Sequence, residues 1–218
     1  GGAMNMGADD LTESTQPVHV VTVSSFEMSR TEATVCQYKA CQKEGICSTP
    51  DIPVAGSDYP VMYVTWQDVN TFCHWAGGRM CSESEWEYAA RNGDKEDLYP
   101  WGDQQPSYEL AVFGMDAQDL LCSNSPQAVC SRTVGTNEWG ICDLGGNVSE
   151  WVQDWYHDDY TNSPDDGTAW LEPVTTVRVV RGGDFESIWS ELRASHRRPA
   201  PPDSFQAGLG IRCCRNVK

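Results

Sequence analysis

The sequence predicts a loop-rich α+β domain in which two or three helices lie among short strands of mixed direction. Helix-start signals occur three times, all within the first 93 residues. Residues 93–142 then show no periodicity and are rich in Gly, Pro, Asn, Asp and Ser, as loops and short strands are. Because neither an internal repeat nor a linker is visible, we expect one domain over residues 16–218. Residues 1–15 are interpreted as an N-terminal extension or expression tag.

Each predicted helix begins with a capping box. In this motif a Ser or Thr side chain and the side chain three residues later each accept the other residue's backbone N–H. The three pairs are Thr34 with Gln37, Thr65 with Asp68, and Ser82 with Glu85. Glycines follow at residues 45, 77–78 and 93, which predicts where each helix ends.

Strands are predicted on both sides of the irregular middle of the chain. Residues 17–27 alternate as a half-buried strand does, and residues 176–183 are rich in Val and end in two glycines. The aromatic segment 148–156 and the segment 207–214 complete the set.

The net charge of the chain and the length of its apolar runs limit the kinds of partner that we expect. The net charge of −17 makes nucleic acid an improbable partner because phosphate is repelled, and it makes a cation the more natural counter-ligand. The alternative is that the acidic excess only keeps the protein soluble. No apolar run approaches the roughly 20 residues that cross a bilayer, and no leader sequence is visible.

Ten cysteines without a C-x-x-C pair favour disulfides over a zinc site. They indicate an oxidising compartment: extracellular, cell-surface or periplasmic. Spacing supports one pair directly, Cys41 with Cys47, since these two bracket the end of the first helix and Gly45 allows the chain to reverse.

Six phrases in order resemble the formylglycine-generating-enzyme (sulfatase-modifying factor) family. They are PVHVVTVSSFEMSRTEATVCQY, YPVMYVTWQDVNTFCHWAGGRMCSESEWEYAAR, YPWG, GICDLGGNVSEW, VVRGGDF and GLGIRCC, between residues 16 and 215. The resemblance implies a variant of the C-type lectin fold, held together by disulfides and bound calcium.

The resemblance also indicates that the family's oxidative chemistry is missing. The enzyme binds copper(I) through two cysteines that follow its Arg-Gly-Gly strand, since both partners are soft. Residues 181–193 contain no cysteine, so we expect no copper and no formylglycine-generating activity. Related sulfoxide synthases use an iron-binding histidine cluster, whereas the four histidines here are scattered. A relative in periplasmic pyoverdine maturation keeps open the alternative of a periplasmic or extracellular oxidoreductase that uses other residues.

A binding role is the leading interpretation. In the variable proteins of diversity-generating retroelements, which share this fold, the segment after Arg-Gly-Gly carries the exposed binding residues. The resemblance therefore implies a secreted or surface-exposed bacterial receptor for an unknown protein, small molecule or glycan. Aromatic and arginine side chains beside serines are typical of binding surfaces; the alternative is that Trp189 and Phe205 are core residues. The candidate ligand-binding residues are Asp184, Glu186, Ser187, Trp189, Ser190, His196, Arg198, Ser204 and Phe205.

The resemblance also implies a structural calcium ion in the loop 143–150. The carbonyls of Asp143, Gly146 and Val148 and the carboxylate of Glu150 would supply part of the six to eight oxygens that calcium takes. The alternative is an ordinary turn with Glu150 exposed.

The family positions also imply a disulfide between Cys73 and Cys213. A second family calcium site would begin near residues 111–113, but Val112 stands where the family has asparagine. We expect a Cys122–Cys130 disulfide to replace that ion, with Asp116 and Asp119 as the alternative. For the remaining cysteines we favour Cys81 with Cys142 and Cys36 with Cys214.

Overall fold

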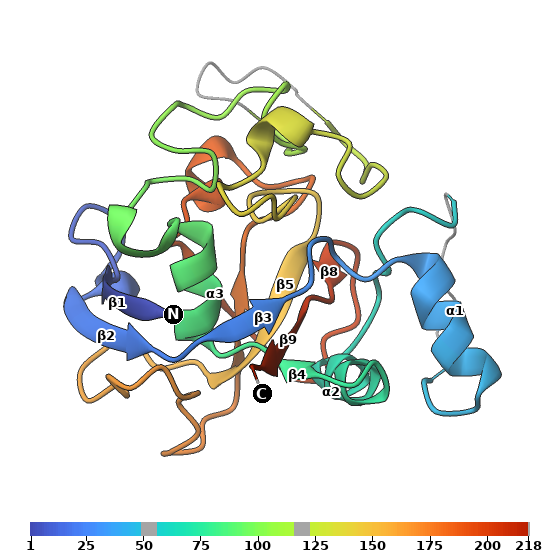
Figure 1. Ribbon diagram of the computed structural model, residues 1–218, viewed down its shortest axis with the longest axis horizontal. Helices are drawn as coiled ribbons and strands as arrows, with labels where there is room; N and C mark the ends of the chain where they lie inside the picture. Colours follow the sequence, from blue (N-terminus) through green and yellow to red (C-terminus); the bar gives the residue numbers. More distant parts are fainter. Residues whose placement is uncertain (49–55, 116–122, 218) are drawn as a thin grey trace.

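The computed structural model describes residues 1–48, 56–115 and 123–217, and in these ranges it contains three small sheets and three α-helices. The elements lie around the long strand β5, and α1 projects to one side (Figure 1). Long loops occupy much of the remaining chain, so the α+β, loop-rich class is confirmed.

All three predicted helices form at their capping boxes. They are α1 (Val35–Lys43), α2 (Trp66–Trp75) and α3 (Glu83–Ala90), and in each the Ser or Thr cap accepts from the backbone N–H three residues later. Helix α2 buries Val69, Phe72 and Cys73, whereas every residue of α3 is buried. Four short 3₁₀ helices span Glu13–Thr15, Gly93–Lys95, Thr133–Gly135 and Trp189–Leu192.

The first sheet includes residues that were expected to lie outside the domain. Strand β1 (Gly2–Met6) pairs antiparallel with β2 (His19–Val23). Met4 and Met6 alternate inward and pack with Val21 in a buried cluster. The side chains of Met4 and Met6 therefore contribute to a buried cluster.

The second and third sheets bring together strands that are far apart in the sequence. In the second, β9 (Cys213–Asn216) lies between β3 (Phe26–Met28) and β4 (Arg79–Met80), and both pairings are antiparallel. The third has the order β7-β6-β5-β8. Its strands are β5 (Ser149–Trp155), β6 (Arg178–Arg181), β7 (Arg197–Ala200) and β8 (Leu209–Gly210). The β5–β8 pairing is parallel and the other two are antiparallel, so the predicted mixed direction is correct.

Buried ion pairs tie α3 to the third sheet. Arg181 lies 2.5 Å from Glu87 and 3.4 Å from Glu83, and Arg197 lies 2.7 Å from Glu83. These four side chains are at most 3% exposed. Because an unpaired charge in such a position is costly, each of these residues depends on the others.

Two predicted disulfides are confirmed and the rest of the predicted pairing is wrong. Cys41 is bonded to Cys47 and Cys73 to Cys213. Cys130 is bonded to Cys142, which excludes Cys122–Cys130 and Cys81–Cys142. Cys122, Asp116 and Asp119 lie outside the described residues.

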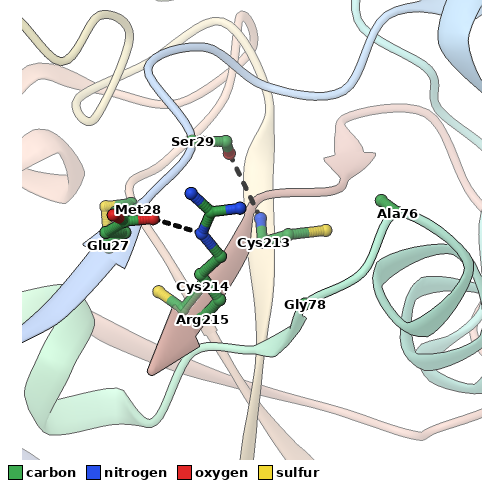
Figure 2. Close-up of a pocket in the computed structure, with 8 residues that line it drawn as sticks. All are labelled: Glu27, Met28, Ser29, Ala76, Gly78, Cys213, Cys214 and Arg215. Atoms are coloured by element: carbon green, nitrogen blue, oxygen red, sulfur yellow. Dashed lines mark hydrogen bonds and ion pairs between the residues drawn. The ribbon is translucent and has the colours of Figure 1, made fainter. Parts of the chain in front are cut away.

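The position of Cys213 and Cys214 next to each other explains why the predicted Cys36–Cys214 pair is wrong. Cys214 is bonded to Cys81 rather than to Cys36. Neighbouring side chains on a strand point to opposite faces, and the sulfurs of Cys213 and Cys214 point to opposite sides of β9 (Figure 2). Cys213 therefore reaches α2 while Cys214 reaches the residue that follows β4. Cys36 is exposed and has no disulfide partner among the described residues.

Within the part of the chain that the structure describes, no helix has both the length and the apolar character needed to cross a bilayer.

Candidate functional site

The segment after β6 turns sharply at two glycines. Gly182 and Gly183 have φ values of +95° and +68°, in the left-handed region that favours glycine. A side chain at Gly182 would also come within 3.2 Å of Trp86 and of the Leu144 carbonyl. The turn places the following residue, Asp184, next to Ser149, the first residue of β5.

Asp184, Ser149 and Arg198 form a largely buried polar cluster, in which Ser149 is buried and the side chains of Asp184 and Arg198 are 16% and 32% exposed. The Asp184 Oδ2 atom lies 3.4 Å from Ser149 Oγ and 3.9 Å from Arg198 Nη2. Arg198 Nη2 also donates to Ser149 Oγ at 3.3 Å. Three strands and the loop after β6 meet here, because Ser149 is on β5, Arg198 is on β7, and Gly208, which precedes β8, packs directly against Asp184.

The predicted residues next to Asp184 are joined to it by hydrogen bonds. Its Oδ1 atom accepts from the Glu186 N–H at 3.0 Å and from Ser187 Oγ at 3.3 Å, and the Ser187 hydroxyl accepts from the Asp184 N–H. Ser187 is thus held in a local turn. The structure therefore brings Asp184, Glu186, Ser187 and Arg198 together as one site.

An apolar hollow of about 230 Å³ lies beside this cluster. It rests on a buried cluster of Met62, Val112, Val148 and Phe185, against which Tyr63 and Ala207 also pack. The predicted residue Phe205 is 50% exposed, and its ring centre lies 5.6 Å from that of Tyr63. The full lining comprises Val35, Tyr59, Pro60, Met62, Tyr63, Asn124, Ser125, Pro126, Phe185 and Ala207.

Tyr63 has a φ of +57°, which is unusual for an aromatic residue. Such backbone strain persists only where the surroundings enforce it, and it is often found at binding sites. Sequence reasoning missed Tyr59, Met62, Tyr63 and Ser149, since their part in the site depends on segments that are distant in the chain. No local signal in the sequence distinguishes them from core residues.

The other predicted binding residues lie elsewhere. Trp189 packs against the cluster of Tyr99, Phe113 and Leu192, which supports the alternative of a core role. Ser190 lies in the same short 3₁₀ helix as Trp189. Ser204 lies in a turn that its N–H closes onto the Pro201 carbonyl.

His196 is largely enclosed beside the polar cluster. The pKa of His196 is lowered to about 4, chiefly by burial and in addition by the positive charges of Arg181 and Arg198, against the opposing effect of Glu191. At neutral pH this imidazole is therefore uncharged.

The expected calcium loop is buried and turns sharply. Asp143, Gly146 and Asn147 have φ values of +58°, +99° and +64°. A side chain on Gly146 would come within 2.4 Å of the Val112 carbonyl, so only glycine fits there. The carbonyls of Asp143, Gly146 and Val148 accept no hydrogen bond from any described residue. Buried carbonyls without donors call for water or an ion, so these three fit a cation.

The Glu150 carboxylate is already engaged by the protein. Its Oε1 atom accepts from Arg212 at 2.7 and 2.8 Å, and Oε2 accepts from Trp86 Nε1 at 2.7 Å. Glu150 is 1% exposed, so the alternative of an exposed Glu150 is wrong. A calcium ion would have to share this carboxylate with Arg212.

Negative charge is in excess around this loop. Burial raises the pKa of Glu32 well above its usual value, and the neighbouring charges of Asp143 and Glu150 raise it further. No three His, Cys, Asp or Glu side chains of the described residues converge closely enough to hold a metal ion by themselves. Any ion here would therefore depend mainly on main-chain oxygens.

A family model described as "Sulfatase-modifying factor enzyme 1-like domain" matches residues 1–217. The chain belongs to this family. Among relatives of the sulfatase-modifying factor domain, the formylglycine-generating enzyme of Thermomonospora curvata is 33% identical over 174 residues, covering 72% of this chain and 55% of the enzyme. The serine/threonine-protein kinase Pkn1 of Chlamydia trachomatis is 35% identical over 162 residues, covering 73% of this chain and 25% of the kinase. The chain thus spans about a quarter to a half of these curated relatives.

Two solved structures superimpose over almost the whole chain. PvdO from Pseudomonas aeruginosa has a TM-score of 0.84 and 27% identity, covering 99% of this chain and 92% of PvdO. Variable protein 1 of Treponema denticola has a TM-score of 0.78 and 19% identity, covering 98% and 92% of the two chains. The expected formylglycine-generating-enzyme-like, C-type lectin-like fold is confirmed.

Proposed function

We propose that this sulfatase-modifying factor domain is a ligand-binding domain without formylglycine-generating activity. Its binding face would comprise the Asp184–Ser149–Arg198 cluster and the hollow beside Phe205. Because the segment that follows Arg181-Gly182-Gly183 contains no cysteine, it offers copper(I) no thiolate pair.

The observation that carries this proposal is the hollow between Tyr63 and Phe185, with Phe205 exposed beside the ring of Tyr63. A concave apolar site beside a few convergent polar groups is the usual form of a ligand site. Exposed aromatic side chains at such an edge are typical anchors for a partner. The fold shared with a Treponema variable protein agrees with a receptor of this type.

The binding role is tested by arrays of peptides and neutral glycans probed with the wild type, Tyr63→Ala and Phe205→Ala. We expect at least one array ligand to bind the wild type and to lose most of its signal with both variants. Trp139→Ala is the matched control, since Trp139 is 51% exposed and lines neither the hollow nor the polar cluster. Binding that survives both aromatic substitutions, or that Trp139→Ala abolishes equally, would place the ligand elsewhere.

The absence of the family's activity is tested with the copper-treated protein and a sulfatase-derived peptide that contains the target cysteine. We expect no aldehyde in the peptide by mass spectrometry. Aldehyde formation above a metal-free control would refute this part of the proposal.

We further propose that calcium stabilises the loop 143–150 and that the domain works in an oxidising compartment outside the cytosol. The carbonyls of Asp143, Gly146 and Val148, which accept no hydrogen bond from the described residues, and the excess of carboxylates support the ion. Four disulfides among the described residues support the compartment.

A second candidate is an oxidoreductase of the same superfamily that uses residues other than cysteine. The likeness to formylglycine-generating enzymes favours it, since the enzyme of Thermomonospora curvata is 33% identical over 72% of this chain. A metal other than calcium that binds near Asp184 and His196 would support this candidate. Metal analysis of the protein after purification without chelators tests it.

A further inference from the structure

A polar trough runs across the outer surface of the second sheet, away from the proposed binding face. It consists of three adjoining hollows of about 300, 600 and 530 Å³. The first shares Glu27, Gly78 and Arg215 with the second, and the second shares Arg79, Asn216 and Val217 with the third. No residue of the trough lines the hollow beside Phe205.

One end of the trough lies between β3, β9 and the turn after α2 (Figure 2). Here the Arg215 side chain extends across β9 and pairs with Glu27. Ser29 accepts from the Cys213 N–H at 3.3 Å, and Ala76 and Gly78 form the opposite wall.

The far end lies between β5, the start of α3 and the loop 166–171. The loop is held firmly, because Ser82 Oγ donates to the Gly167 carbonyl at 2.8 Å and the Trp170 N–H donates to Asp154 at 2.7 Å. Close packing adds to this, since a side chain on Gly167 would come within 2.9 Å of the Val23 backbone. The wall is therefore formed before any ligand arrives, as in most small-ligand sites.

The two arginines of the trough, Arg79 and Arg215, are paired with carboxylates. Arg79 binds both oxygens of Glu85, at 2.6 and 2.7 Å, and also donates to Asn216 Oδ1 at 2.6 Å. Asp166 accepts from the Thr168 hydroxyl at 2.6 Å and from its N–H at 3.0 Å. Both arginines of the trough are therefore paired, and Asp166, which has no cationic partner among the described residues, leaves the trough with a negative charge.

Neutral hydrogen-bonding groups are what remains available. The side chains of Ser24, Ser25 and Gln153 make no hydrogen bond with any described residue, although all three line the trough. The side-chain oxygen of Asn216 accepts from Arg79, so the two N–H donors of its amide remain available to a ligand. Leu171 and Val217, 41% and 53% exposed, add apolar surface between these polar groups.

We propose that this trough is a second binding site, for a neutral oligosaccharide. Serine hydroxyls and carboxamides both donate to and accept from sugar hydroxyls, and the exposed aliphatic groups can contact the C–H faces of the rings. The series of adjoining hollows suits several sugar units in a row. The net charge of −17 disfavours anionic sugars.

The test is saturation-transfer NMR of the intact chain with maltotriose, cellotriose, chitotriose and mannotriose at millimolar concentration, and with sialyllactose as the anionic comparison. We expect at least one neutral trisaccharide to bind and sialyllactose to bind more weakly. Gln153→Ala and the double change Ser24→Ala, Ser25→Ala remove hydrogen-bonding groups with no internal partner, so each should weaken binding by about threefold to tenfold.

Tyr63→Ala is the control, because Tyr63 lines the hollow beside Phe205 and no part of the trough. The melting temperature of each variant checks that it has folded. The proposal is wrong if no trisaccharide binds, or if folded Gln153→Ala and the serine double variant bind as the wild type does. It is equally wrong if Tyr63→Ala abolishes the sugar signal, although that result would support the binding face around Phe205.

Discussion

Arg212 binds the carboxylate of Glu150 through Nε and Nη2, at 2.8 and 2.7 Å, inside the loop where calcium is expected. The same guanidinium donates to the carbonyls of Ser29 and Cys142. Arg212, which lies just before β9, is therefore connected to the start of β5 through Glu150, to the segment after β3 through Ser29, and to the disulfide-bonded Cys142. This pairing gives Glu150 a structural role whether or not calcium binds.

Calcium should raise the melting temperature of the wild type, and chelator should lower it. An ion that binds only the folded state at 100 times its dissociation constant adds about 2.7 kcal/mol of stability. Glu150→Gln should destabilise the protein in both conditions, because Arg212 loses its partner, and it should also shrink the difference between them. Equal melting temperatures with calcium and chelator in the wild type would show that the loop is an ordinary turn.

Glu87→Ala should destabilise the domain strongly. Glu87 is fully buried and pairs with Arg181 and Arg91, so its removal leaves Arg181 with only the longer contact to Glu83 and takes from Arg91 its carboxylate partner. Breaking a buried pair in this way typically costs about 3–5 kcal/mol, measured by urea unfolding. Glu138→Gln, which breaks the exposed pair with Lys95, is the control and should change stability little. Similar losses in the two variants would contradict the assignment of Arg181–Glu87 as a core pair.

Removal of the Cys73–Cys213 bridge should cost more than removal of Cys41–Cys47. The two bridges span 140 and 6 positions of sequence. In the chain-entropy model, the longer loop is worth about 5 kcal/mol and the shorter about 2 kcal/mol. Paired Cys→Ala variants compared by thermal unfolding test this order. A larger loss for the short bridge would mean that local strain or packing dominates over loop entropy.

Lowering the pH from 6.5 to 4 should reduce the free energy of unfolding of the wild type more than that of the His196→Gln variant. Because the pKa of His196 falls from 6.5 to about 4 on folding, the unfolded chain takes up a proton in this range that the folded chain does not. The contribution of His196 to the free energy of unfolding is thus fully present above pH 6.5. It falls by at most about 3 kcal/mol as the pH is lowered.

The comparison with His196→Gln is necessary because Asp154 acts in the opposite direction. Burial and the charge of Glu83 raise the pKa of Asp154 to about 7, so its ionisation weakens the fold as the pH rises from about 4 to 7. If the wild type and His196→Gln show the same pH profile, His196 is not responsible for the loss.

Local chemistry determined which parts of this protein the sequence could predict. The three capping boxes fixed the helix starts because each box is complete within four residues. The Cys41–Cys47 bridge is likewise confined to the end of one helix. The family phrases predicted the fold and the Cys73–Cys213 bridge, since their order along the chain carries information that no single segment has.

Only the tertiary structure decided the contacts between distant segments. Cys81 pairs with Cys214 because β4 and β9 are adjacent and alternate side chains of β9 face opposite ways. The strand β1, the Arg212–Glu150 pair and the hollow between Tyr63 and Phe185 likewise join residues that are far apart in sequence. Spacing and periodicity describe one segment at a time, whereas these features depend on which segments the folded chain places side by side.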